Sequence, residues 1–165
     1  MKPIQYEAEG WGVGELWLED DVLVWHELPR PGLEPSARSH PLAERMAAYF
    51  AGERVSLDDV ELDLDWCSPF QRAVAEALRT VPYGETVTYG ELAALAGYPN
   101  AQRAAGTFCA RNRLPLLLPC HRVVAAAFGR GPALSRRLWK PESLGSYGSL
   151  GVEYKRRLLE LEGAL

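Results

Sequence analysis

The spacing of apolar side chains changes near residue 66, and this change constrains the fold more than any other feature of the chain. Before it, apolar and polar residues alternate in Gly14 to Glu19 and in Val22 to Leu28, as in strands with one buried face. The acidic run Glu19-Asp20-Asp21 between them predicts a hairpin turn. After residue 66 the apolar residues follow helical intervals. We therefore expect an α+β protein in which a small strand-rich domain packs on a helical one.

The N-terminal domain is expected to carry one helix beside its strands. Apolar residues recur at helical intervals from Pro41 to Phe50, and Gly52 ends this segment. An acidic, strand-like segment follows from Val55 to Trp66. These features predict an N-terminal α+β domain at residues 1–65 and a linker near Asp63 to Cys67.

The C-terminal domain, residues 66–165, begins with two clear helix starts. Ser68 is a suitable N-cap, and Pro69 occupies the first helical position after it. Thr88 and Glu91 have the three-residue spacing of a capping box, in which a hydroxyl and a carboxylate satisfy backbone N–H groups at a helix start. Each pair predicts a helix that begins at that position.

Two short helices follow one another in this domain. The capping box opens a helix that runs to Leu95, and Ala101 to Ala110 predicts a second one, rich in small residues. This order fits a helix-turn-helix in which the second helix recognises DNA. Two packed helices of an ordinary domain would give the same pattern.

Charge is distributed unevenly along the chain, whose formal net charge is −4. Residues 1–65 hold 15 acidic and 5 basic residues, a net charge of −10, whereas residues 66–165 hold 7 and 13, a net charge of +6. Attraction to a polyanion depends on local potential. The asymmetry predicts a phosphate-binding surface on the C-terminal domain, with ordinary solvated charge as the alternative.

Composition excludes several classes of protein. No apolar run approaches the roughly 20 residues that a membrane span needs. Met1 to Gly10 lacks the features of a secretory signal, so we expect a cytoplasmic protein. Cys67, Cys109 and Cys120 have neither an even count nor paired metal-ligand spacing, which favours free thiols and no bound metal.

One cysteine stands in a setting typical of a nucleophile. Leu114 to Leu118 is apolar and strand-like, and it leads into the run Pro119-Cys120-His121-Arg122-Val123-Val124. Neighbouring positive charge favours the thiolate, which is the nucleophilic form. Taken by themselves, the neighbours Cys120 and His121 are weak evidence for a nucleophile. Buried cysteines usually act as small apolar core residues, and an adjacent histidine is often structural.

The chain resembles the O6-alkylguanine-DNA alkyltransferases, also called methylated-DNA-protein-cysteine methyltransferases, from about Ser68 to Gly163. The motifs that carry this resemblance are Pro69-Phe70-Gln71, Val81 to Thr86, Tyr89 to Ala93, Ala101 to Ala105, Asn112, Pro119 to Val123 and Leu158 to Gly163. It implies DNA repair in which a damaged guanine is flipped out of the duplex and its alkyl group passes irreversibly to the protein. The expected partner is double-stranded DNA containing O6-alkylguanine, with O4-alkylthymine as a further candidate substrate. The resemblance also implies that the protein is a monomer, needs no cofactor and does not bind a membrane.

The resemblance assigns roles to five catalytic residues. Cys120 accepts the alkyl group, and His121 takes the thiol proton through a water molecule while Glu162 orients it. Tyr89 donates a proton to the leaving base, and Asn112 braces the turn before the nucleophile. Two of these residues also have simpler interpretations: Glu162 would be a solvated helix end, and Tyr89 an aromatic residue at a helix cap.

The resemblance also implies binding residues. The DNA contacts are expected at Arg103, Tyr89, Ala104, Gly106 and Arg122, and the guanine pocket at Tyr147, Ser149, Val123, Pro115 and Cys109. Arg103 would enter the duplex in place of the flipped base, for which a planar guanidinium is suited; an exposed arginine on a phosphate is the alternative.

One segment departs from the family pattern. Residues 125–146 make the chain longer than the usual member by roughly a dozen residues, which leaves the register of the two pocket residues after it open. The basic residues of this insertion are Arg130, Arg136, Arg137 and Lys140. We expect a basic loop that contacts the DNA backbone, and a surface loop without a role is the alternative.

Two other functions fit part of the sequence. A lesion sensor of the same fold would bind and flip the base without accepting its alkyl group. A thiol hydrolase using Cys120 and His121 would turn over many times and would not depend on DNA. Counting the alkyl groups transferred per chain separates these possibilities, because only the alkyltransferase accepts one and then stops.

Overall fold

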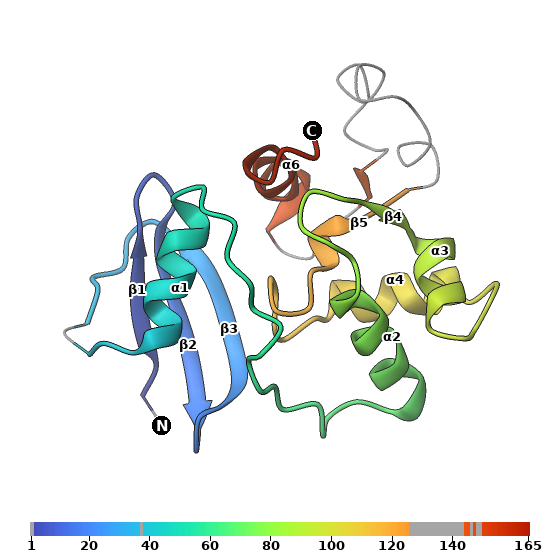
Figure 1. The fold of residues 1–165 in the computed structure, drawn as a ribbon, viewed down its shortest axis with the longest axis horizontal. Helices are drawn as coiled ribbons and strands as arrows, with labels where there is room; N and C mark the ends of the chain where they lie inside the picture. The colour runs from blue at the N-terminus through green and yellow to red at the C-terminus, as the bar shows by residue number, and fades with distance from the viewer. Residues whose placement is uncertain (1, 37, 126–143, 146, 148–149) are drawn as a thin grey trace. The chain divides into compact units, whose positions relative to one another are not determined.

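A computed structural model describes the whole chain except residues 1, 37, 126–143, 146 and 148–149 (Figure 1). Backbone contacts divide it into two compact units. The first unit consists of residues 1–64 and 113–117, and the second of residues 65–112 and 118–165. The chain therefore returns once to the first unit, a departure from the single division expected near residue 65.

The first unit contains a three-stranded antiparallel sheet in the order β1-β2-β3, formed by β1 (Ile4–Ala8), β2 (Gly12–Glu19) and β3 (Val22–Arg30). The predicted hairpin is confirmed. Asp20 and Asp21, at φ 51° and 66°, form its turn in the left-handed region that two-residue hairpin turns require. The first strand was not predicted, although its buried residues Ile4, Tyr6 and Ala8 alternate with polar ones.

Helix α1 (Pro41–Phe50) has the bounds that the sequence predicted and packs against the sheet (Figure 1). His40 caps it: Nδ1 accepts a hydrogen bond from the backbone N–H of Leu42 at 3.0 Å. Met46 and Phe50 lie in the core of this unit, as their spacing indicated.

The strand predicted at Val55 to Trp66 is wrong. This segment is irregular, and Leu62 alone forms an isolated bridge, with Leu23 at the edge of β3. Turns at residues 58–59 and 65–66 interrupt the segment, so only this bridge forms beside β3.

Both predicted helix starts of the second unit are confirmed. Helix α2 (Pro69–Arg79) begins at Ser68, whose hydroxyl accepts from the N–H of Gln71 at 3.2 Å. Helix α3 (Tyr89–Leu95) begins with the capping box of Thr88 and Glu91. Helix α4 (Gln102–Ala110) packs against α3 and follows a turn in which Gly97 and Asn100 have positive φ.

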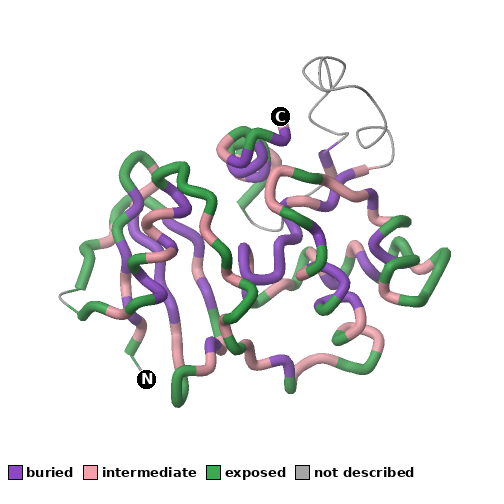
Figure 2. The backbone as a smooth tube through the Cα atoms, in the orientation of Figure 1, coloured by how far each residue is buried: buried purple, intermediate pink, exposed green. Residues whose placement is uncertain are grey.

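The apolar run before Cys120 does not form the predicted strand. Pro115 and Pro119 lack backbone N–H donors, and Leu116 adopts a φ of 72°, so the run cannot keep a regular ladder. Cys120 instead opens a short 3-10 helix, η1 (Cys120–Arg122). Residues 116–121 are nonetheless all buried (Figure 2).

A short parallel sheet holds the residues directly after η1. Strand β5 (Val123–Val124) pairs in parallel with β4 (Val87–Thr88), which leads directly into α3. Helix α6 (Gly151–Leu161) ends the unit and contributes Leu159 to a core cluster with Val124. No helix among the described residues is long and apolar enough to cross a membrane.

Candidate active site

The Cys120 thiol lies at the first residue of η1 and is 4% exposed. Asn112 follows helix α4 and donates from Nδ2 both to the carbonyl of Leu118, at 2.8 Å, and to Sγ of Cys120, at 3.2 Å. One amide group thus holds both the backbone at Leu118, just before η1, and the thiol of Cys120.

Burial dominates the electrostatics of this thiol. It raises the pKa of Cys120 above its ordinary value, while the hydrogen bond from Asn112 and the charge of Lys155 act in the opposite direction. Neighbouring positive charge favours the thiolate, as expected, but burial outweighs it, so the neutral thiol is the resting form. A base must take the proton before the sulfur can act as a strong nucleophile.

His121 and Glu162 form a buried pair with the properties of such a base. Nε2 of His121 lies 2.6 Å from Oε2 of Glu162, and both side chains have no exposed surface. Because a carboxylate accepts, Nε2 carries the hydrogen and Nδ1 carries a lone pair. Nδ1 is buried and has no hydrogen-bond partner among the residues that the structure describes. Burial outweighs the carboxylate and lowers the pKa of His121, so its ring is neutral and can accept a proton.

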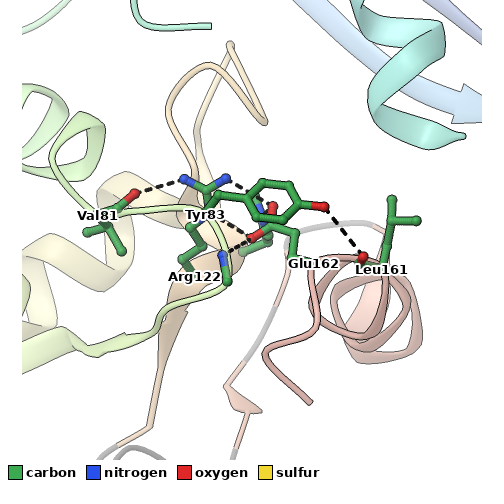
Figure 3. A network of polar contacts seen from close by, with 7 residues as sticks. Val81, Tyr83, Arg122, Leu161 and Glu162 are labelled. Atoms are coloured by element: carbon green, nitrogen blue, oxygen red, sulfur yellow. Dashed lines mark hydrogen bonds and ion pairs between the residues drawn. The ribbon is translucent and has the colours of Figure 1, made fainter. Parts of the chain in front are cut away.

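Glu162 is held from several sides (Figure 3). Arg122 donates to it from Nε at 2.9 Å and from Nη2 at 3.0 Å, and the backbone N–H of Gly84 donates at 3.2 Å. Burial alone would raise the pKa of Glu162, but His121 and Arg122 outweigh burial and hold the pKa well below its usual range. Glu162 is thus a buried carboxylate with fixed donors, and the alternative of a solvated helix end is wrong.

The DNA contact expected of Arg122 conflicts with this arrangement. Its Nη1 donates to the carbonyl of Val81 at 2.8 Å, its other donors hold Glu162, and its side chain is 12% exposed (Figure 3). The guanidinium also lies over the ring of Tyr83 at 5.8 Å. Arg122 positions the carboxylate inside the protein, so we do not retain it as a phosphate-binding residue.

Tyr89, the first residue of α3, lies beside a buried lysine. Lys155 Nζ donates to the Tyr89 hydroxyl at 3.4 Å and lies 5.6 Å from the centre of its ring. Burial lowers the pKa of Lys155 to about 8 and raises the pKa of Tyr89. A side chain on Gly145 would come within 2.8 Å of the Tyr89 hydroxyl, so the glycine there leaves room for it.

Sequence reasoning missed Lys155, although a signal was present. Lys155, Leu158, Leu159 and Glu162 recur at the intervals of one helix face, and all four are buried. A lysine in that row cannot reach water by its position alone and must have an internal partner.

The comparisons with known proteins decide the family. The family described as "6-O-methylguanine DNA methyltransferase, DNA binding domain" matches residues 69–164. The chain belongs to this methyltransferase family. A methylated-DNA–protein-cysteine methyltransferase of Methanopyrus kandleri is 40% identical over 141 residues, which cover 84% of the chain and 93% of the relative. One from Mycobacterium tuberculosis is 41% identical over 137 residues, which cover 83% of the chain and 70% of the relative.

Solved structures extend the similarity to the first unit. The crystal structure of Mycobacterium tuberculosis OGT in complex with DNA aligns with a TM-score of 0.75 at 35% identity, covering 98% of the chain and 93% of the relative. The O6-methylguanine-DNA methyltransferase of Pyrococcus kodakaraensis aligns with a TM-score of 0.66 at 25% identity, covering 98% of each. The fold of this methyltransferase therefore includes the strand-rich region, where the sequence motifs gave no match.

The remaining predicted residues fall into three groups. In the second unit, Arg103 and Ala104 are exposed on α4, and Gly106, on the same helix, is half-buried and packs against Tyr89. Among the expected pocket residues, Tyr147 and Val123 are buried and Cys109 is half-buried. Pro115 belongs to the first unit, and its carbonyl contacts His26. Lying outside the described residues are Ser149, Arg130, Arg136, Arg137 and Lys140.

Metal ligation has no candidate in the part of the chain that the structure describes. No group of three or more His, Cys, Asp or Glu side chains there could hold a metal ion. The groups described in this site are the Cys120 thiol, the His121 ring as a base, and the Tyr89 hydroxyl and Lys155 amine as proton donors.

Proposed function

We propose that this chain repairs O6-alkylguanine in double-stranded DNA by transferring the alkyl group to Sγ of Cys120. Membership of the methyltransferase family supports this, together with relatives named methylated-DNA–protein-cysteine methyltransferase. The observation that carries it is the buried thiol of Cys120, which accepts a hydrogen bond from Asn112 and directly precedes the buried His121 that is paired with Glu162. A thioether is stable in water, so each molecule acts once.

The first step is removal of the thiol proton. Cys120 and His121 are neighbours in a 3-10 helix, where successive side chains point about 120° apart, so the proton reaches Nδ1 of His121 through a water molecule. Glu162 accepts from Nε2 and stabilises the imidazolium as it forms, with Arg122 holding the carboxylate in place. The sulfur then attacks the alkyl carbon, and the carbon–oxygen bond breaks with its electron pair going to guanine.

The second requirement is a proton for the departing base. In the proposed arrangement Tyr89 donates its hydroxyl proton to N3 of guanine, which neutralises the leaving group. Lys155 lies within hydrogen-bond distance of that hydroxyl and stabilises the phenolate that remains. The proton held by His121 balances the one that Tyr89 has given up.

Helix α4 would present the DNA-binding face. Arg103 is exposed near its start, and the exposed and half-buried residues that follow it on the same helix are small, which allows close approach to a DNA backbone. We assign the protein to the cytoplasm, because an acceptor thiol must stay reduced until it meets its substrate. It would act as a monomer without a cofactor.

Intact-mass measurement tests the proposal. After reaction with excess duplex containing O6-methylguanine, the chain should gain one methyl group, located on the peptide that carries Cys120. Cys120→Ser should gain none and still bind the duplex, because a serine hydroxyl of similar size is not nucleophilic at neutral pH. Cys67→Ser is the matched control and should react as the wild type does.

Each other outcome contradicts the proposal in a different way. A methyl group on Cys67 or Cys109 would show that Cys120 is not the nucleophile. Binding without transfer would indicate a lesion sensor, and repeated turnover that does not depend on DNA would indicate a thiol hydrolase.

A further inference from the structure

A buried histidine of the first unit binds the loop that precedes the active-site turn. His26, on β3, is 2% exposed. Its backbone N–H donates to the carbonyl of Arg113 at 3.0 Å, and its Nδ1 lies 2.7 Å from the carbonyl oxygen of Pro115. A carbonyl can only accept, so Nδ1 carries the hydrogen and Nε2 is an acceptor. The Tyr6 hydroxyl supplies the donor for Nε2 at 2.6 Å.

Tyr6 is placed for this contact by the sheet. It pairs across β1 and β2 with Gly14, and its ring lies so close that a side chain on Gly14 would clash with it. The absence of a side chain there lets the ring cross the neighbouring strand and reach His26. Burial lowers the pKa of His26 to about 4, so the ring is neutral and this donor order holds at physiological pH.

The loop that His26 binds has an unfavourable backbone conformation. Leu116, at φ 72°, occupies the left-handed region that a side chain disfavours. Such a conformation persists only where its surroundings fix it. The carbonyls bonded to His26 belong to Pro115, directly before Leu116, and to Arg113, three residues before it, and the side chain of Leu116 is buried.

Both ends of this loop lead to the thiol. Residues 113–117 belong to the first unit, whereas the residues on either side belong to the second. Those flanking residues are Asn112 and Leu118, which are joined by the Asn112 amide at 2.8 Å. The same amide donates to Sγ of Cys120. The conformation of the loop therefore sets the position of the hydrogen-bond donor that the thiol uses.

We propose that His26 is a positioning residue for Cys120: it holds loop 113–117 in the conformation in which Asn112 can hydrogen-bond the thiol. This rests on the proposed alkyl transfer to Cys120. It gives the strand-rich unit a part in the reaction, through Tyr6, His26 and a loop of its own.

The test compares His26→Leu with the wild type in single-turnover transfer from O6-methylguanine duplex at saturating DNA, over a range of pH. At saturating DNA this is a first-order rate constant, whose value does not depend on the fraction of molecules that are folded and react. We expect the rate constant at pH 7 to fall by about 10-fold or more, since small misplacements of a reacting group are costly. The midpoint of its pH profile should rise, because the Asn112 hydrogen bond lowers the thiol pKa in the wild type.

Three further variants separate positioning from stability. Asn112→Ala should show the same upward shift, and combining it with His26→Leu should add little, as expected for residues that act through one contact. Tyr6→Phe removes only the hydroxyl and should move the profile in the same direction by less. His40→Ala removes the cap of α1 in the same unit, so it should lower the melting temperature and leave the rate constant unchanged.

A purely structural role predicts a different result. If His26→Leu melts earlier but keeps the wild-type rate constant and pH midpoint, the proposal is overturned. If His26→Leu does not fold, Tyr6→Phe decides by the same two measurements. Failure of the wild type to accept any methyl group would instead overturn the proposed function.

Discussion

Two buried ionisable side chains, Lys155 of helix α6 and Glu162 at its C-cap, lie seven residues apart, which is close to two helical turns, so both belong to the buried face. Glu162 meets His121 and Arg122, whereas Lys155 meets Tyr89. A buried charge destabilises a fold unless it is paired, and each of these groups has a partner from another element. The helix thus supports both proposed proton transfers, at the thiol and at the leaving base.

Lys155→Met should separate charge from packing. Methionine is of similar length and suits a buried site, so the melting temperature should stay the same or rise. The rate of methyl transfer should fall by about 10-fold or more, because the Tyr89 phenolate loses its neighbouring charge. In the wild type this charge is present below about pH 8 and lost above it, so the rate should decline through that pH, whereas the variant should lack the decline. Single-turnover rates between pH 6 and 10 measure both, and an unchanged rate in the variant would remove Lys155 from the reaction.

Among the elements, those fixed by local chemistry could be predicted from the sequence. The helix starts at Ser68 and Thr88 depend on side chains three residues apart, and the hairpin depends on a two-residue turn. The segments at Val55 to Trp66 and Leu114 to Leu118 could not be predicted in this way. Their apolar residues look strand-like, but only tertiary contacts decide whether a partner strand exists.

The same distinction applies to the candidate site. The neighbours Cys120, His121 and Arg122 stand out in the sequence, but the direction of each side chain does not follow from adjacency. Arg122 turns to Glu162, 40 residues away, and His26 reaches Pro115 across 89 residues. Contacts of such long separation leave no periodic signal in a single sequence, so the role of Arg122 and the binding of loop 113–117 needed coordinates.

Helix α4 carries a prediction of its own. If Arg103 occupies the space of the flipped base, Arg103→Ala should slow transfer from duplex DNA by about 10-fold or more and leave the reaction with free O6-benzylguanine nearly unchanged. The reason is that extrusion of the base is needed only in the duplex. Parallel rate measurements on the two substrates check this. The control variant is Arg72→Ala, which removes an exposed arginine of α2 and should leave both rates nearly unchanged. Equal losses on both substrates would mean that Arg103 supports the site itself.

At the scale of the whole molecule, charge divides the chain more sharply than secondary structure does. Residues 1–65 have a net charge of −10 and residues 66–165 one of +6. An evenly mixed chain with a net charge of −4 would gain little from a polyanion. The second unit can attract DNA because its excess of basic residues is local.

The four basic residues of the insertion test how far this positive surface extends. If Arg130, Arg136, Arg137 and Lys140 contact phosphates, replacing all four with glutamine should weaken duplex binding and reduce the slope of log affinity against log salt by about 0.9 for each phosphate that is no longer neutralised. The reaction with free O6-benzylguanine should stay nearly the same, because that substrate has no phosphate. The control removes four exposed basic side chains from the acidic unit, namely Lys2, Arg30, Arg38 and Arg54. Binding curves at several salt concentrations measure the slopes. A slope equal to that of the wild type would show that the insertion does not contact DNA, whereas a weakening shared by both variants would reflect total charge alone.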